Sequence, residues 1–265
     1  MSGLSTDAVA DLLREVAADV ITPRFRSLDA DEVMEKNPGD LVTVADREAE
    51  VLISGRLREA YPDAVVLGEE EYAGDRSLMD RYVAAGHAFT VDPVDGTKNF
   101  VGGSPDHAVM VAEIVDGESV RAWIHQPAHG VTWTAERGAG TYRDGERITC
   151  TPVAEGAMPR GVTSAWSLKD HTLEGLAPMG LSWVCCGVDY PRLLEGATDY
   201  IVYSRSNPWD HAPGTLMVRE AGGCVAHPDG SPYEPRSLRP GLVVAVDSHT
   251  CGAVQRRVQE HFTRD

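Results

Sequence analysis

The strongest structural signal in this sequence is Val-Asp-Pro-Val-Asp-Gly-Thr-Lys-Asn-Phe, residues 91–100. An apolar run ends here, and Pro93 fixes its own φ and lacks an N–H, which predicts that the strand stops and the chain turns. Asp92 and Asp95 can then point toward one spot, next to the free backbone N–H groups that follow. Carboxylate oxygens beside such N–H groups suit a Mg²⁺ ion that holds a phosphate. The Asp-Gly pair taken alone would also fit a hairpin turn.

Acidic residues stand out in two other segments. Glu69-Glu70-Glu71 follows the short β-branched run 64–66, and adjacent carboxylates at a strand end repel one another unless a cation or solvent relieves them. Asp210 lies in Asn207–Gly214, at the start of a segment whose apolar residues recur with helical spacing. Taken alone, the first segment fits a solvated acidic loop, and the second fits a helix N-cap or first-turn aspartate.

Together these segments resemble the inositol monophosphatase family of metal-dependent, lithium-sensitive phosphatases. The matching motifs, in the family's order, are Gly68-Glu69-Glu70, Asp92-Pro-Val-Asp95-Gly-Thr97 and Trp209-Asp210. Lys36–Asp46 also resembles the family's N-terminal active-site segment, and Glu220-Ala-Gly-Gly223 its pattern after the Trp-Asp helix. The resemblance covers most of the chain. It implies a layered αβαβα sandwich of the inositol monophosphatase and fructose-1,6-bisphosphatase type.

Length and composition limit the remaining possibilities. The chain has 265 residues, enough for one large domain or two closely packed lobes, and a net charge of −17 argues against nucleic-acid binding. No apolar run is long enough for a membrane-spanning helix, and the first residues lack the pattern of a secretory signal. The five cysteines form no paired zinc-type spacing. We therefore expect a reduced, cytoplasmic protein without a membrane partner.

The periodicity of apolar residues predicts an α/β protein of two sublobes. A helix is predicted over Ser5–Arg26, and a capping-box-like start at Thr43–Asp46 predicts a second helix that ends before Pro62. The segments 64–67, 88–91, 108–115, 120–125, 131–135, 160–163, 181–186, 199–203 and 242–246 are expected to be strands. The segments 187–195, 209–221 and 249–262 are expected to be helices. We divide one continuous domain into an N-terminal α+β lobe, 1–151, and a C-terminal α/β lobe, 152–265.

The resemblance implies a site for two or three Mg²⁺ ions, with most ligands in the N-terminal lobe. The first ion would bind Glu69, Asp92 and the carbonyl oxygen of Val94. The second would bind Asp92, Asp95 and Asp210, so that Asp92 bridges the two ions. Asp95 and Asp210 would also face the bound phosphate. Metal ions held in this way can activate water, neutralise phosphate oxygens and stabilise the leaving alkoxide.

Further residues receive roles in hydrolysis from the same resemblance. Glu70 and Thr97 would orient and deprotonate the attacking water, with Asp46 beside Thr97 as a helper. The backbone N–H groups of Gly96 and Thr97 would bind the phosphate. Lys36 starts a loop rich in turn residues and could close over the phosphate, although a solvated loop lysine is an equal alternative.

Substrate choice is expected to depend on the segments Tyr203–Ser206 and Cys185–Asp189. Inositol phosphatases commonly place an acidic residue seven positions before the Trp-Asp aspartate, and this chain has Tyr203 there. Histidinol-phosphate phosphatases tend to carry an aspartate near the position of Cys185, which this chain lacks at that point. Arg205 would favour a second anionic group on the substrate. The chain therefore matches neither the inositol phosphatase pattern nor the histidinol-phosphate phosphatase pattern.

The sequence therefore predicts a Mg²⁺-dependent phosphomonoesterase that acts on a small polyol or sugar phosphate, with inositol 1-phosphate first among the candidates. Histidinol-phosphate phosphatase and sugar bisphosphatase are the alternatives within the family. A different class is a binding partner of the transcription machinery, a role that some relatives have. Family members are usually homodimers, so we expect a homodimer.

Overall fold

A seven-stranded sheet contains the first half of residues 91–100. The computed structural model, which describes residues 3–262, orders this sheet as β3-β4-β5-β6-β7-β8-β9. The pair β3 and β4 is parallel and the other neighbouring pairs are antiparallel, as the sequence predicts for most of this region. The strands are β3 Val65–Gly68, β4 His87–Asp95, β5 Ala108–Val115, β6 Glu118–Gln126, β7 Val131–Glu136, β8 Gly140–Arg143 and β9 Glu146–Ile148.

A five-stranded sheet forms the core of the other half of the molecule, in the order β11-β10-β12-β14-β13. Strand β10 is parallel to both of its neighbours, whereas β14 is antiparallel to β12 and β13. The strands are β10 Gly161–Thr163, β11 Gly180–Leu181, β12 Tyr200–Tyr203, β13 Cys224–Ala226 and β14 Leu242–Ala245.

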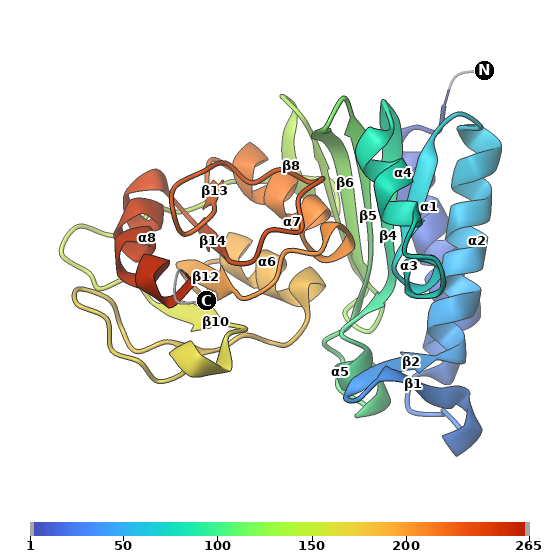
Figure 1. Ribbon diagram of the computed structural model, residues 1–265, viewed down its shortest axis with the longest axis horizontal. Coiled ribbons are helices and arrows are strands. Elements are labelled where there is room, and N and C mark those ends of the chain that lie inside the picture. Colours follow the sequence, from blue (N-terminus) through green and yellow to red (C-terminus); the bar gives the residue numbers. More distant parts are fainter. Residues whose placement is uncertain (1–2, 263–265) are drawn as a thin grey trace.

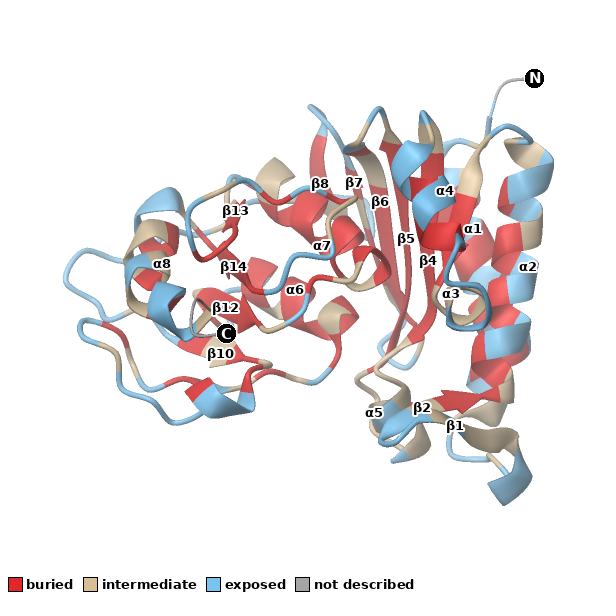
Figure 2. Cartoon of the chain, viewed as in Figure 1, coloured by how far each residue is buried: buried red, intermediate tan, exposed pale blue. Residues whose placement is uncertain are grey.

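Helices and sheets alternate in five layers (Figure 1). Helices α1 and α2 cover one face of the large sheet, α6 and α7 lie between the two sheets, and α8 covers the outer face of the small sheet. Figure 2 shows the face of α2 toward the sheet as buried and the opposite face as exposed. The helices are α1 Thr6–Val16, α2 Val44–Ala60, α3 Glu69–Gly74, α4 Leu78–Ala84, α5 Thr97–Val101, α6 Cys186–Leu194, α7 Pro208–Glu220 and α8 Ser248–Phe262. The expected αβαβα sandwich is confirmed.

The prediction that the strand stops at Pro93 is wrong. Strand β4 continues to Asp95, and its pairing with β5 is irregular between Asp92 and Asp95, as in a β-bulge. On the other side, the pairing with β3 already ends at Val91. Pro93 therefore sits where neither neighbour needs its missing N–H, the kind of position in which a sheet accepts proline.

The predicted helix over Ser5–Arg26 is also broken up. Helix α1 ends at Val16 and is followed by a π-helical turn, Ala17–Ile21, and a 3₁₀ turn, Thr22–Arg24. The apolar stripe is nevertheless buried as predicted: Leu12, Leu13, Val16, Ala17, Val20 and Ile21. Pro23, which cannot donate a backbone hydrogen bond, lies inside the closing turn and fits the end of the helix there.

Other short elements differ from the prediction. Cys185 and Cys186 were expected in a strand over 181–186, but they cap and begin α6. The loop expected after Lys36 is a hairpin of β1, Val33–Asn37, and β2, Asp40–Thr43, closed by Gly39 at a φ of 78°. The sequence also gave no indication of α3, α4, β8, β9 or β13. No helix in residues 3–262 has the length and apolar character to cross a bilayer.

His107 is a buried, neutral component of the core beside α5. Its ring lies 4.8 Å from that of Phe25 and 5.0 Å from that of Phe100, between centroids, and only 1% of the residue is exposed. Burial lowers the pKa of His107 to about 4, although a contact with the Ser104 carbonyl opposes the shift. Below the unfolded pKa, near 6.5, the unfolded chain takes up a proton that the folded protein does not. Stability contributed by this site is therefore complete above pH 6.5 and falls as the pH falls toward 4.

We expect His107→Phe to reduce the acid sensitivity of the fold. Between pH 7 and pH 5 the variant should lose about 2 kcal/mol less of its free energy of unfolding than the wild type does. Urea denaturation at the two pH values measures this loss in each protein. Comparing the losses removes any effect of phenylalanine on packing that is the same at both pH values. The exposed His249, replaced by alanine, serves as the control and should keep the wild-type pH dependence. Equal pH dependence in His107→Phe and the wild type would contradict this account.

Candidate active site

Three aspartates from two distant segments converge between the sheets. Asp92 and Asp95 lie at the bulged end of β4, and Asp210 lies in the first turn of α7, after Pro208 at its first position. One carboxylate oxygen of each lies within 4.8 Å of the others. The sequence placed these three residues in one site, and the fold brings them together.

The chemistry of this cluster suits a cation. Asp92 is 1% exposed, and its Oδ1 has no hydrogen-bond partner among the described residues. Burial, followed by the charges of Glu69, Asp95 and Asp210, raises the pKa of Asp92 well above its usual range. Burial and the same repulsion raise the pKa of Asp210. A hard divalent cation would remove this repulsion and bind the unpaired oxygen, since Mg²⁺ prefers carboxylate ligands.

Asp95 is held in place by the start of α6. Its Oδ2 accepts the N–H of Gly187 at 2.5 Å and lies 3.1 Å from the Cys185 thiol. Burial raises the pKa of Asp95 to about 6, and these two donors limit the shift. Gly187 is needed for this approach, because a Cβ there would lie 2.4 Å from the Ala108 side chain. Cys185, which begins the segment that the sequence linked to substrate choice, thus contacts one of the three aspartates.

Glu69 and Glu70 begin α3 and share one counter-ion. The Lys36 ammonium of β1 lies 2.7 Å from Glu69 Oε1 and 2.7 Å from Glu70 Oε1. Burial acts to lower the pKa of Lys36, but the two glutamates outweigh it and raise that pKa above its usual value. Burial raises the pKa of Glu70 to about 7, against the effect of Lys36. These contacts do not fit the alternative that Lys36 is a solvated loop lysine.

Glu50 is a residue of this region that sequence reasoning missed. From α2 its carboxylate accepts the backbone N–H groups of Glu70 and Glu71, each at 2.7 Å, and so caps the start of α3. A Cβ at Gly68 would lie 2.3 Å from this carboxylate, so glycine is required for the contact. Burial raises the pKa of Glu50 to about 7. A signal was present: Glu50 follows Asp46 by one helical turn, and both are buried.

Thr97 and Asp46 lie together on the other side of the bulge. The Thr97 hydroxyl lies 3.1 Å from Asp46 Oδ1 and 3.0 Å from the Val94 carbonyl oxygen. Asp46 is fixed in turn by Thr43, whose N–H donates to Oδ2 at 2.9 Å in the capping box predicted for α2. Burial raises the pKa of Asp46 to about 6. Gly96 precedes α5 as its N-cap residue at a φ of 81°, which favours glycine.

Two adjoining clefts open beside these residues. A cleft of about 700 Å³ is lined by Lys36, Glu69 and Trp209, and one of about 880 Å³ is lined by Asp95 and Asp210. The exposed side chains of Lys98 and Arg205 line both. Tyr203 also lines the larger cleft but is 2% exposed.

Asp189 contributes a further buried carboxylate to the larger cleft, at the end of the segment Cys185–Asp189 that the sequence linked to substrate choice. It lies four residues after Cys185 and accepts the Trp183 N–H at 2.7 Å. Burial raises the pKa of Asp189 to about 8.

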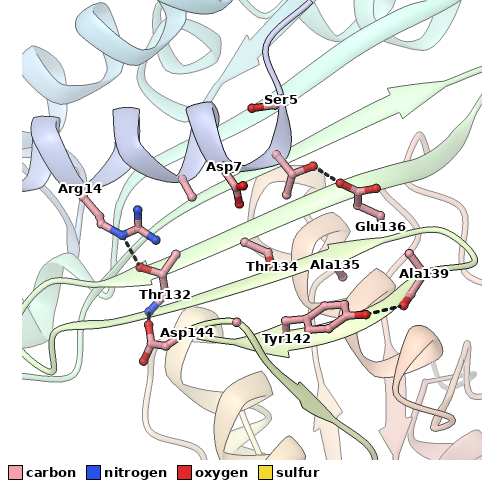
Figure 3. Close-up of a pocket in the computed structure, with 13 residues that line it drawn as sticks. Ser5, Asp7, Arg14, Thr132, Thr134, Ala135, Glu136, Ala139, Tyr142 and Asp144 are labelled. Atoms are coloured by element: carbon pink, nitrogen blue, oxygen red, sulfur yellow. Dashed lines mark hydrogen bonds between the residues drawn. The ribbon is translucent and has the colours of Figure 1, made fainter.

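A separate cleft of about 480 Å³ lies between α1 and strands β7 and β8 (Figure 3). None of the site residues predicted from the sequence lines it. Its polar groups bond to one another: Arg14 donates to the Thr132 hydroxyl at 3.1 Å, and the Thr132 N–H donates to Asp144 at 2.9 Å. This arrangement offers no group of converging carboxylates.

Comparisons with known proteins identify relatives of this chain. The family model described as the inositol monophosphatase family matches residues 5–264. A Thermotoga maritima protein named fructose-1,6-bisphosphatase/inositol-1-monophosphatase is 34% identical over 204 residues, which cover 72% of this chain and 74% of the relative. The Nus factor SuhB of Pseudomonas aeruginosa is 30% identical over 265 residues, with 93% of each chain covered.

Solved structures have the same architecture. The Thermotoga maritima IMPase structure superposes with a TM-score of 0.76 at 27% identity, over 96% of this chain and 98% of the other. The match over nearly the whole chain, together with the relative at 34% identity, establishes the relationship. The chain therefore belongs to the inositol monophosphatase family.

Proposed function

We propose that this protein is a Mg²⁺-dependent phosphomonoesterase that hydrolyses the phosphate ester of a small polyol or sugar. The observation that carries the proposal is the cluster of Asp92, Asp95 and Asp210, in which Asp92 is buried and one of its carboxylate oxygens lacks a partner among the described residues. A carboxylate cluster with this repulsion is costly unless a cation neutralises it. Inositol 1-phosphate is the reference substrate for this class.

Five residues would hold two or three Mg²⁺ ions. Glu69, Asp92 and the Val94 carbonyl would form one ligand set, and Asp92, Asp95 and Asp210 the other. When bound, the ions supply Lewis-acid stabilisation of the phosphate oxygens and lower the pKa of a coordinated water.

The remaining groups would prepare the attacking water and hold the substrate. Glu70 would accept the proton of the water, and its pKa of about 7 suits a general base at neutral pH. Asp46 orients the Thr97 hydroxyl at 3.1 Å, which leaves that hydroxyl positioned to hold the water. The Gly96 and Thr97 N–H groups would bind the phosphate, and Lys36 would bind it on release from the glutamates.

We expect phosphate release from inositol 1-phosphate to require Mg²⁺ and to stop on chelation. The test is inorganic phosphate release with EDTA or with Mg²⁺, on inositol 1-phosphate, histidinol phosphate and fructose 1,6-bisphosphate. The last two substrates represent the alternative activities within the family. Mg²⁺ should also raise the Tm, because a ligand that binds only the folded state stabilises it. A folded protein that binds Mg²⁺ and releases phosphate from no ester would defeat the proposal.

A second candidate function is a partner role in transcription. The similarity to a protein named Nus factor SuhB over 93% of the chain favours it. The proposed metal ligands distinguish the two functions, since a scaffold has no need of an acidic cluster around the buried Asp92. A cellular phenotype unchanged by Asp95→Asn would support the partner role over the hydrolytic one.

A further inference from the structure

The larger cleft has an apolar rim beside its acidic floor. Trp166 and Val184 line this cleft, and they are 73% and 57% exposed. Trp166 is the most exposed of the large apolar side chains in residues 3–262. An exposed tryptophan at the mouth of a cleft indicates a binding surface more often than an exposed small side chain does.

Trp166 is held outward by a rigid turn. It begins the 3₁₀ turn η4, Trp166–Leu168, in which Leu168 is 3% exposed and packs in the core under α8. The Ser167 hydroxyl bonds to His261 Nε2 of α8 at 2.8 Å. The Lys169 ammonium lies 5.5 Å from the centroid of the indole ring. The residues that follow Trp166 are thus anchored to α8 and the core, and these contacts hold the tryptophan in its exposed position.

Val184 occupies an unfavourable backbone conformation. Its φ is 58°, in the left-handed region, where a β-branched residue is a strong outlier. Burial of the side chain does little to offset this backbone strain, because more than half of it is exposed. Strain of this kind persists at positions where the side chain is needed for binding. At this position the Val184 side chain forms an apolar wall of the cleft.

The charges and the size of the cleft restrict what could bind there. Lys98 and Arg205 line it, although the whole chain carries a net charge of −17. The volume of the cleft, about 880 Å³, is near the upper end of the range found for ligand-binding pockets. The cleft can therefore hold a ligand larger than a single small ring. Asp95, Asp189 and Asp210 also line the cleft, and two of these aspartates are proposed metal ligands. An anionic ligand with a flat apolar part would suit the cleft, because Lys98 and Arg205 would contact its negative charge and Trp166 its flat part.

We propose that Trp166 and Val184 bind a planar aromatic or heteroaromatic ring attached to the sugar phosphate that the enzyme hydrolyses. This inference rests on the proposed phosphomonoesterase function and narrows its sugar-phosphate class. The scissile phosphate lies at the aspartate cluster, the sugar lies in the cleft, and the ring contacts the indole. Stacking of a base on an aromatic side chain is worth a factor of about 5 to 150 in affinity.

Matched substrates make the test specific. Adenosine 5′-monophosphate and ribose 5-phosphate share the same primary phosphate ester and differ in the base, and the 2′- and 3′-monophosphates sample other attachment points. The readout is the ratio of kcat/KM for the best adenosine monophosphate to that for ribose 5-phosphate. The wild type should have a ratio of about 10 or more. Trp166→Ala should lower the ratio at least about fivefold, mainly through KM, and Trp166→Phe should retain most of it. Met158, which is 59% exposed and lines neither cleft, gives the control Met158→Ala.

Val184→Gly separates binding from structure. Glycine accepts a positive φ without strain, so this variant should be at least as stable as the wild type in urea. Its substrate ratio should nevertheless fall, because the apolar wall is lost. A residue with a structural role alone would not give higher stability together with lower selectivity.

Three outcomes would overturn the inference. One is a wild-type ratio near one for all three adenosine monophosphates, and another is an unchanged ratio in Trp166→Ala. The third is a change of oligomeric state in both variants by sedimentation, with equal loss on every substrate, which would assign these side chains to contact with a second copy of the chain. Mg²⁺-dependent release from ribose 5-phosphate in all three cases would leave the proposed function intact, whereas no release from any ester would reject that function itself.

Discussion

Asp92→Asn is expected to lower kcat by at least about 10³-fold and to leave the fold intact. Asp92 belongs to both proposed ligand sets, and asparagine keeps its volume but removes its charge. Burial and three neighbouring carboxylates already raise the pKa of Asp92, so a neutral side chain should be tolerated there. In EDTA the variant should melt at or above the wild-type Tm, and the increase in Tm on adding Mg²⁺ should be lost or strongly reduced.

Phosphate release and thermal unfolding with and without Mg²⁺ measure both effects. Asp116→Asn is a matched control, because Asp116 is exposed at the turn between β5 and β6 and its φ of 51° suits asparagine as well. The control should resemble the wild type in both assays. Wild-type activity in Asp92→Asn would show that the metal assignment is wrong.

Glu70→Gln is expected to lower kcat by about 10²- to 10⁴-fold, the usual contribution of a general base. Glutamine keeps the size of the side chain and an oxygen for Lys36, but it does not accept a proton. The metal ligands are untouched, so Mg²⁺ should still raise the Tm. Steady-state kinetics and the Mg²⁺ dependence of the Tm distinguish a chemical defect from a metal-binding defect.

The neighbouring residue supplies the control for this variant. Glu71 begins the same helix but pairs with Arg58 at the surface and does not bond to Lys36. Glu71→Gln should change kcat less than about twofold, since exposed ion pairs contribute little. Equal losses in the two variants would mean that the charge of α3, rather than proton transfer at Glu70, sets the rate.

The sequence allowed the fold class and the acidic cluster to be predicted, the first from the periodicity of apolar residues and the second from an ordered set of short motifs. The alternation of apolar residues predicted an α/β protein of two sublobes, whereas the layered sandwich was implied by the family resemblance of the motifs around Asp92, Asp95 and Asp210. The rule applied to Pro93 failed because proline stops a strand only where its N–H would be needed, and a bulge removes that need. Whether a bulge occurs depends on the neighbouring strand.

The contacts that support the acidic cluster could not be predicted from the sequence, for a different reason. Lys36 meets Glu69 and Glu70 across 33 and 34 residues, and Cys185 meets Asp95 across 90. Such pairs are fixed by the packing of separate elements, and no spacing in the chain encodes them. Glu50 is the exception, since its position one turn after Asp46 on α2 is a local pattern.

The contact between Asp95 and α6 makes the site depend on the packing of two layers. Asp92 and Asp95 come from the large sheet, whereas Asp210 and the Gly187 N–H come from the helices that separate it from the small sheet. Neither layer alone holds the full set of groups. A small displacement of α6 and α7 would break up the cluster while both sheets remained folded. Catalytic activity should therefore be more sensitive to the alignment of the layers than the global stability of the fold is.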